Sequence, residues 1–568
     1  MRFVKPYKWE LFLTIVIGLM KFAIPLFTPY LLMVILDDII GATALTDAEK
    51  TTKLLWWLGG AAILFFVLRP PIEYYRQYFA QNLSNNILFD IRKELYGHLQ
   101  RLSLKYYSNT RAGEVISRMI NDVEQTKNFV MTGLMNLWLD LATIIIAIVI
   151  MFNLNVKLTI VALIALPLYA FSVKFFFTKL RDLTRKRSQA LAGVQSYLHE
   201  RVAGMSIIKS FTLEDHEQNI FDEANGQFKN AALNHSRWNA KSAMVVNTIT
   251  DIAPLLVIGY AAYEVINGNV SVGELVAFSA YIERLYNPLR RLVNSSTTLT
   301  QSIASMDRMF ELMDETYDVQ NKENAIEMPK AKGKVQFDQV SFKYAPDGNT
   351  ILDSINFTIE PGETIAFVGM SGGGKSTIVS LLPRFYDATE GAIRIDNLDV
   401  RDVTIKSLRS QIGIVLQDNI LFSDSVRENI LMGNPGASNE EVIAAAKAAN
   451  AHDFIMGLPE GYATKVGERG VKLSGGQKQL LNLASIMVME PKVLLLDEPT
   501  SQLDPIAALE FLQTLKRLNE ELGLTVIIVE HRLEEVLPLS ERVLVMDNGA
   551  ILYDGEPKKM LQTIDQNH

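Results

Sequence analysis

The most constraining feature of this sequence is a series of apolar runs, each long enough to cross a lipid bilayer as a helix. The run 11–36 contains one charged residue, Lys21, and roughly 20 apolar residues in a helix cross a bilayer core about 30 Å thick. A secretory signal would be shorter and would end at a small-residue cleavage site. Further predicted spans are 54–68 continuing toward 78, 134–152, 158–177, 244–266 and 272 to about 299. The sequence therefore predicts six membrane-spanning helices, of which the last is the least apolar.

The positions of Lys and Arg predict how these helices are oriented. Both residue types are frequent at the start of the chain and in the long stretches between spans two and three and between spans four and five. Because basic segments stay on the cytoplasmic side, we predict a multi-pass membrane protein with both termini in the cytoplasm. The two long stretches have a helix-forming composition, so the membrane helices are expected to continue well beyond the bilayer before turning back.

The character of the chain changes after residue 299. The stretch 314–333 is polar, has little apolar periodicity and is predicted to be a linker. Beyond it, Val335 and Phe337, then Val340 and Phe342, alternate as in a strand with a slip between the two pairs. Short apolar runs then alternate with helical segments. We therefore predict an α-helical transmembrane domain over 1–313, the linker, and an α/β domain over 334–568.

Composition excludes several classes of function. The chain has 568 residues, which at roughly 100–200 residues per domain implies several structural units. Since it contains no Cys, it cannot form disulfides, zinc–thiolate sites, iron–sulfur clusters or thiol nucleophiles. Its net charge of −8 argues against a nucleic-acid partner, because surfaces that bind nucleic acid are usually basic.

A phosphate-binding loop is predicted in the α/β domain, where TIAFVGMSGGGKSTIVSLL gives a β-branched run, a glycine-rich loop and a helix. Gly369, Gly374, Lys375 and Ser376 match the phosphate-loop pattern. In that pattern backbone N–H groups form an anion nest, the lysine reaches the β- and γ-phosphates, and the serine hydroxyl ligates Mg²⁺. The alternative is a glycine turn that matches by chance, on the order of once in a hundred sequences from average residue usage. The predicted nucleotide-binding residues are Gly369, Met370, Ser371, Gly372, Gly373, Gly374, Lys375, Ser376 and Thr377.

Two acidic residues and a histidine follow apolar runs further along the chain. Asp497 and Glu498 follow the run 493–496; we predict that Asp497 holds Mg²⁺ and that Glu498 polarises the attacking water. Taken alone, an apolar run that ends in two acids is more often a simple strand end, but the phosphate loop favours the catalytic interpretation. His531 follows the run 525–529, where it could contact the γ-phosphate, although a lone histidine is usually incidental.

Residues 473–477 read LSGGQ. Together with the phosphate loop, Gln417, the LLLDE segment and His531, they closely resemble the ATP-binding cassette (ABC) transporters. The resemblance implies a P-loop ABC ATPase domain in which this signature closes over ATP bound to the phosphate loop of a second subunit, so one cassette per chain implies a dimer. It also implies a catalytic set of Gln417, Glu498 and His531. The remaining implied roles are adenine stacking by Tyr344, γ-phosphate sensing and Mg²⁺ ligation by Gln417, nucleotide binding in trans by Ser474, Gly475, Gly476 and Gln477, and bridging of the two sites by Asp504.

The segments RPPIEYYRQY, NDVEQTK, LHERVAGMSIIKSF and TKVGERG extend the resemblance to bacterial half-size multidrug exporters of the homodimeric kind. In those exporters, short coupling helices at the tips of the cytoplasmic loops press on the cassettes; here they would lie near 102–107 and 208–214. The resemblance implies ATP-driven export of hydrophobic or amphipathic compounds across the cell's inner (plasma) membrane by alternating access, with ATP and Mg²⁺ as cofactors and a cytoplasmic ATPase domain. The implied partners are a second copy of the chain, the bilayer and a hydrophobic small-molecule or lipid substrate. A lipid flippase would look the same in sequence, and a heterodimer stays open.

The resemblance to exporters weakens after the signature. Leu480 stands where exporters carry a second basic residue, and DEPTSQLDP and VEHRLEEV are more similar to the ATPases of energy-coupling-factor vitamin importers. Exporters also have Ala directly before the histidine that corresponds to His531, whereas this chain has Glu there. One hypothesis is that the segment 476–568 comes from another branch, through natural recombination or construction of a chimera. A second hypothesis is that the chain is an importer-like ATPase module. Importers usually keep the membrane and ATPase parts on separate chains, so their fusion here favours export.

Ionisable residues within or near the spans are candidates for the substrate path, since charge inside a membrane is costly and usually faces a cavity or a partner. Interfacial placement or structural ion pairs would explain such residues about as well. The candidates are Lys21, Asp140, Asp251, Glu283 and Arg284.

Overall fold

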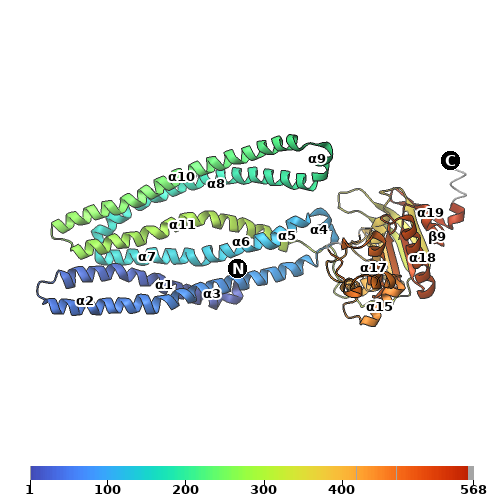
Figure 1. Ribbon diagram of the computed structural model, residues 1–568, viewed down its shortest axis with the longest axis horizontal. Coiled ribbons are helices and arrows are strands. Elements are labelled where there is room, and N and C mark those ends of the chain that lie inside the picture. Colours follow the sequence, from blue (N-terminus) through green and yellow to red (C-terminus); the bar gives the residue numbers. More distant parts are fainter. Residues whose placement is uncertain (1, 418, 468–469, 561–568) are drawn as a thin grey trace. The chain divides into compact units, whose positions relative to one another are not determined.

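The computed structural model describes residues 2–417, 419–467 and 470–560. The chain forms two compact units, one from residues 1–100 and 113–314 and the other from residues 101–112 and 315–568. Long helices make up the first unit, and the second is built on β-sheets with helices packed against them (Figure 1). The short segment 101–112 therefore belongs to the second unit although helices of the first unit flank it in sequence.

The helices of the first unit include several that change locally to the wider π-helical form. The elements in chain order are η1 (Lys5–Tyr7), α1 (Lys8–Val34), η2 (Ile35–Ile40), α2 (Asp47–Ala62), η3 (Ile63–Leu68), α3 (Arg69–Leu99), α5 (Ala112–Ser117), η4 (Arg118–Asp122), α6 (Val123–Asn128), η5 (Phe129–Asn136), α7 (Leu137–Leu154), α8 (Val156–Ala203), α9 (Met205–Phe211), α10 (Glu214–Ile266) and α11 (Val272–Met313).

Five helical segments among the described residues are long and apolar enough to cross a membrane. They are Lys5–Ile40, Asp47–Leu99, Ala112–Leu154, Val156–Ala203 and Glu214–Ile266. The sixth predicted span lies on α11, a helix of 42 residues that carries more polar residues. Five of the six predicted spans therefore have helices of the required length and apolarity, and the sixth stays a prediction.

The two longest helices confirm that the membrane helices continue beyond the bilayer. α8 has 48 residues and α10 has 53, which at 1.5 Å per residue corresponds to about 70–80 Å. That is more than twice the thickness of a bilayer core, about 30 Å. The two helices run alongside each other and are joined by the short α9 (Figure 1), which overlaps the position predicted for the second coupling helix.

The second unit contains two sheets. One has the strand order β2-β1-β4-β5 and the other β10-β9-β3-β8-β7-β6. In the larger sheet β6, β7, β8, β3 and β9 are parallel, with β10 antiparallel at the edge. The strands are β1 (Val335–Phe342), β2 (Leu352–Ile359), β3 (Thr364–Gly369), β4 (Glu390–Ile395), β5 (Leu398–Asp399), β6 (Ile412–Val415), β7 (Val493–Asp497), β8 (Thr525–Val529), β9 (Arg542–Asp547) and β10 (Ala550–Gly555).

The second unit also contains helices, several of which pack on the sheets. The helices are α4 (Leu104–Asn109), α12 (Lys375–Leu381), α13 (Ile405–Arg409), α14 (Val426–Leu431), α15 (Asn439–Ala448), α16 (His452–Met456), α17 (Gly475–Met487), α18 (Pro505–Leu522) and α19 (Leu533–Val536), with a 3-10 turn η6 (Gly461–Ala463). Both faces of the parallel sheet are buried, as is usual for parallel sheets. Along β7, Val493 and Leu495 join one apolar core while Leu494 and Leu496 join the other.

The slip predicted within the first strand is confirmed. β1 pairs with β2 in one register through Phe337, the register shifts between Phe337 and Val340, and it shifts again between Val340 and Phe342. Gln339, at the first shift, has a φ of 48°. An extra residue of this kind is a β-bulge, which keeps the apolar side chains of both halves on the buried face.

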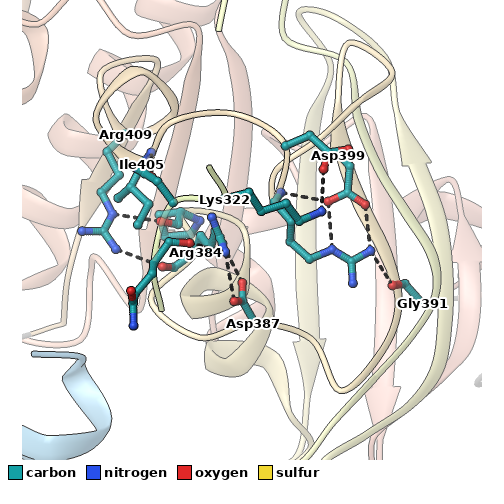
Figure 2. Close-up of polar contacts among 12 residues, drawn as sticks. Lys322, Arg384, Asp387, Gly391, Asp399, Ile405 and Arg409 are labelled. Carbon is teal, nitrogen blue, oxygen red and sulfur yellow. Dashed lines mark hydrogen bonds and ion pairs between the residues drawn. The ribbon is translucent and has the colours of Figure 1, made fainter. Parts of the chain in front are cut away.

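The polar segment after α11 packs along the second unit. Lys322 forms an ion pair of 2.6 Å with Asp402, Arg384 donates to the carbonyl oxygen of Gln320 at 2.9 Å, and Ile405 donates its N–H to the Asn321 side chain at 2.8 Å (Figure 2). Two apolar residues of the segment are buried, Met328 and Ala331. The stretch predicted as a linker thus has fixed contacts along much of its length.

The helix α4 is held on the second unit by contacts to the polar segment. The Ser103 hydroxyl, just before α4, donates to Asp318 at 2.7 Å, and the Lys105 ammonium lies 4.0 Å from the same carboxylate. α4 overlaps the position predicted for the first coupling helix.

Candidate nucleotide site

The predicted phosphate loop lies between β3 and α12, at the carboxyl end of a central strand. Gly369 ends β3 with a φ of 141°, and a Cβ there would lie 2.0 Å from the carbonyl oxygen of Met546, so only glycine fits. Gly374 begins α12 with a φ of 95°. Lys375 is 4% exposed, and its ammonium donates to the carbonyl oxygens of Gly369 and Met370 at 2.9 and 2.8 Å. The lysine therefore lies within the curve of the loop.

Burial perturbs the two charged groups nearest the loop in opposite directions. It lowers the pKa of Lys375, against the attraction of Glu498 and Asp497. It raises the pKa of Asp497, an effect that the hydrogen bond from Ser376 opposes and the charge of Glu498 reinforces. The Ser376 hydroxyl is 3.0 Å from Asp497. A bound phosphate would stabilise the charged form of Lys375, and a bound cation would stabilise the ionised form of Asp497.

Glu498 is the centre of a second group of contacts. One carboxylate oxygen accepts from the side-chain amide of Gln417 at 2.8 Å, and the other is 3.1 Å from His531 Nε2. Glu498 follows β7 in the left-handed region, with a φ of 47°, and its side chain is 20% exposed. The structure thus brings together three predicted residues that follow the neighbouring strands β6, β7 and β8.

One further acid lies beside this group and was not predicted. Glu530, directly after β8, is 1% exposed. It accepts hydrogen bonds from Thr500 and from the backbone N–H of His531. The available signal was an acid between a fully buried strand and His531, in the VEHR segment that departs from the exporter pattern.

Tyr344 lies at the rim of the loop. The residue is 42% exposed, its hydroxyl is 3.2 Å from the Thr377 hydroxyl, and its ring packs edge-to-face on Tyr386 with 5.2 Å between ring centroids. An aromatic face that is open to solvent and fixed at its edge can stack on a planar base. Met370, Ser371 and Gly372 form the exposed outer part of the loop.

The predicted signature and Asp504 form a separate group at the starts of α17 and α18. The Ser474 hydroxyl accepts from the Gln477 N–H, and the Gln477 side chain accepts from the Ser474 N–H at 3.0 Å, in a capping box. Asp504 caps α18 by accepting from two backbone N–H groups, at 3.1 and 3.0 Å. A Cβ at Gly475 would lie 3.0 Å from the Gln502 carbonyl oxygen, and one at Gly476 would be 3.3 Å from Ala507. The signature glycines therefore allow α17 to approach the start of α18. Glu468 and Arg469 of TKVGERG lie outside the described residues.

Three of the five candidate substrate-path residues are paired within the membrane helices. Lys21 contacts Glu73 at 2.7 Å, Asp140 contacts Arg291 at 2.6 Å, and Asp251 contacts Arg290 at 2.7 Å. These contacts favour the ion-pair interpretation for those three. On α11, Glu283 is exposed and Arg284 is half-buried.

Comparison with known families agrees with both units. The family described as "ABC transporter transmembrane region" matches residues 11–289, and the family described as "ABC transporter" matches residues 352–501. The chain belongs to the ABC transporters.

Relatives of full length define the chain more closely. The "Putative multidrug export ATP-binding/permease protein YgaD" of Bacillus subtilis (strain 168) is 55% identical over 563 residues, covering 99% of this chain and 96% of that protein. A protein of the same description from Staphylococcus aureus (strain Mu50) is 54% identical over 561 residues, with the same coverage. The solved "Structure of a bacterial Atm1-family ABC exporter with ATP bound" has a TM-score of 0.84 at 29% identity, covering 98% of this chain and 96% of that chain. The chain is a half-size ABC exporter, which binds ATP and couples ATP hydrolysis to transport across a membrane.

Proposed function

We propose that this exporter moves hydrophobic or amphipathic compounds of many kinds out of the cell across the inner membrane. The observation that carries the proposal is the 55% identity, over 99% of the chain, to a relative named for multidrug export. We further propose that both termini and the ATPase domain are cytoplasmic. The proposed boundaries along the chain are 1–313 for the transmembrane domain, within which residues 101–112 pack with the second unit, 314–333 for the linker and 334–568 for the ATPase domain.

The roles of the nucleotide-site residues follow from their chemistry. Lys375 exchanges its two carbonyl contacts for the β- and γ-phosphates, and the backbone N–H groups of residues 370–377 surround the phosphates. Tyr344 stacks on adenine. Glu498 accepts the proton of the attacking water, with Gln417 and His531 holding its carboxylate, and His531 also contacts the γ-phosphate.

A magnesium ion fits the oxygen ligands beside the loop. Ser376 and Asp497, 3.0 Å apart, and the amide oxygen of Gln417 are hard ligands of the kind Mg²⁺ prefers. Among the residues that the structure describes, no cluster of three or more His, Asp or Glu side chains could hold a metal by itself. Mg²⁺ is usually bound by one or two protein carboxylates together with the phosphates of a nucleotide, and Asp497 and Ser376 would supply the protein's share. When bound, Mg²⁺ neutralises charge that develops on the phosphates during hydrolysis.

We propose that the working unit is a homodimer. One chain carries one phosphate loop and one signature, and each nucleotide is bound between the loop of one copy and Ser474, Gly475, Gly476 and Gln477 of the other, with Asp504 near the junction of the two sites. Closed cassettes then bind ATP better than open ones, so ATP biases the membrane helices toward the outward-facing state and hydrolysis removes the bias. Transport follows when the substrate has a different affinity in each state.

Reconstitution in liposomes tests the direction and the substrate. The protein is inserted with its cassettes outside, ATP and Mg²⁺ are added outside, and accumulation of an amphipathic dye inside the vesicles is measured. Accumulation that vanishes in the Glu498→Gln variant supports export. ATP-dependent movement of a labelled phospholipid without movement of dye would favour a lipid flippase instead. Net loss of preloaded dye would indicate import and contradict the proposal.

The hypothesis of a separate origin for segment 476–568 stays a prediction. The identities to the relatives describe the chain as a whole. Separate alignment of 1–475 and 476–568 tests the hypothesis, which fails if both segments have the same nearest relatives.

A further inference from the structure

Glu530 is a carboxylate buried where the loops after β7 and β8 meet. It follows Val529, the last residue of β8, and is 1% exposed. Burial of an ionised group is costly unless hydrogen bonds compensate it. A buried acid at this position therefore requires a compensating arrangement of donors.

Three donors from two loops surround the Glu530 carboxylate. One oxygen accepts from the backbone N–H of Thr500 at 2.9 Å and also from the Thr500 hydroxyl. The other oxygen accepts from the backbone N–H of His531 at 3.0 Å. Two N–H groups and one hydroxyl all point at one side chain, and an ionised carboxylate can accept from all of them at once.

These contacts continue the pairing of β7 and β8 beyond the sheet. The last backbone contact between the two strands is the N–H of Glu498 on the carbonyl oxygen of Val529, at 2.8 Å. Past that point the chains separate, and the Glu530 side chain bridges them. The bridge joins the loop that carries Glu498 to the loop that carries His531.

We propose that Glu530 is a positioning residue for ATP hydrolysis, which holds the backbone of His531 so that its ring meets the Glu498 carboxylate. The ring contact measures 3.1 Å between His531 Nε2 and Glu498. The proposal depends on the catalytic roles proposed above for Glu498 and His531. Glu530 itself contacts no reacting atom and acts through His531.

Substitutions separate the two arms of the bridge. In Glu530→Gln the amide oxygen still accepts from Thr500, but the amide NH₂ faces the His531 N–H, donor against donor. Thr500→Val removes the hydroxyl contact and leaves the contact to His531, so it is the matched control. Both variants lose a hydrogen bond of the same buried group, and only one loses the bond that orients the histidine.

The experiment measures kcat and KM for ATP of the full-length protein in lipid nanodiscs. We expect Glu530→Gln to lower kcat about tenfold with KM for ATP changed less than about twofold, while Thr500→Val keeps kcat within about twofold. In the His531→Ala background, Glu530→Gln should reduce kcat by less than about twofold, since residues that act as a unit are not additive.

Three results would overturn this inference alone: a near-normal kcat for Glu530→Gln beside an impaired His531→Ala, equal losses in Glu530→Gln and Thr500→Val, or the same fold loss from Glu530→Gln in both backgrounds. A normal kcat for His531→Ala would overturn the proposed role of His531 and this inference with it. Melting temperatures of all variants separate unfolding from slow turnover.

Discussion

Replacement of Glu498 by Gln tests the proposed base with little change of shape. The new amide oxygen can accept from the Gln417 amide nitrogen, which in the parent lies 2.8 Å from the Glu498 carboxylate. The new amide NH₂ can donate to His531 Nε2, 3.1 Å away in the parent. Because both neighbours keep a partner, we expect the free energy of unfolding to change by no more than about 0.5 kcal/mol.

The expected effect on turnover is large because the group that takes the proton is lost. General base catalysis contributes about 10²–10⁴ in rate, which corresponds to roughly 3–5 kcal/mol in the barrier. ATP binding should change only a few-fold, since the Lys375 ammonium and the loop N–H groups are untouched. The variant should therefore hold Mg·ATP and almost never hydrolyse it.

Phosphate release and nucleotide retention, measured on the same preparation in nanodiscs, check this expectation. Glu534→Gln is the control, because Glu534 is an exposed acid three residues from His531; it should hydrolyse ATP at the parental rate. Turnover of Glu498→Gln above about one tenth of the parent, with an unchanged melting temperature, would exceed what loss of a general base allows. The assignment of Glu498 as the base would then be wrong.

Other substitutions test features away from the base. Gly369→Ala should abolish ATP binding, because its Cβ would lie 2.0 Å from a carbonyl oxygen of β9; retained binding of a fluorescent ATP analogue would contradict this. Asp140→Asn should destabilise the membrane unit by roughly 2–3 kcal/mol, below the roughly 3–5 kcal/mol of a fully buried ion pair, because the Arg291 guanidinium is half exposed; an unchanged melting temperature would refute it. Burial raises the pKa of Asp399, but the hydrogen bonds from Arg401 and the charges of Arg401 and Lys322 together outweigh burial and lower this pKa. Its ionised form therefore stabilises the ATPase unit above the ordinary pKa of aspartate, and this stability is lost as pH falls through the lowered pKa. Asp399→Asn should lower the melting temperature at neutral pH and have a much smaller effect in acid, and an effect independent of pH would argue against the ion pair.

The sequence was informative about the nucleotide site because the site lies where chain geometry is restricted. Gly369 needs a φ of 141° and no side chain, so its identity is visible in the sequence. Gln417, Glu498 and His531 each follow one of three consecutive strands of a parallel sheet, and carboxyl ends of parallel strands meet at one edge. The positions of Glu498 and His531 at strand ends could therefore be anticipated from the apolar runs before them, whereas Gln417 was located only through the resemblance to ABC transporters.

Contacts between distant segments were beyond the reach of sequence patterns. Nothing in the local sequence of Ser103 indicates that it meets Asp318, 215 residues later. The polar composition of 314–333 predicts a linker, yet Met328 and Ala331 are buried, and two isolated apolar residues are too weak a periodic signal. Glu530 was missed for a similar reason, because a buried acid is rare and its donors come from another loop.

The assignment of α4 to the ATPase unit means that the chain passes between the two units three times, after residues 100, 112 and 314. Displacement of the ATPase unit is consequently transmitted to α3, α5 and α11 through covalent bonds, which cannot slip as a packed interface can. Truncation at residue 313 would also remove Asp318, the carboxylate that Ser103 and Lys105 contact, and leave α4 without the group that holds it. Neither half of this transporter can be excised cleanly with one cut.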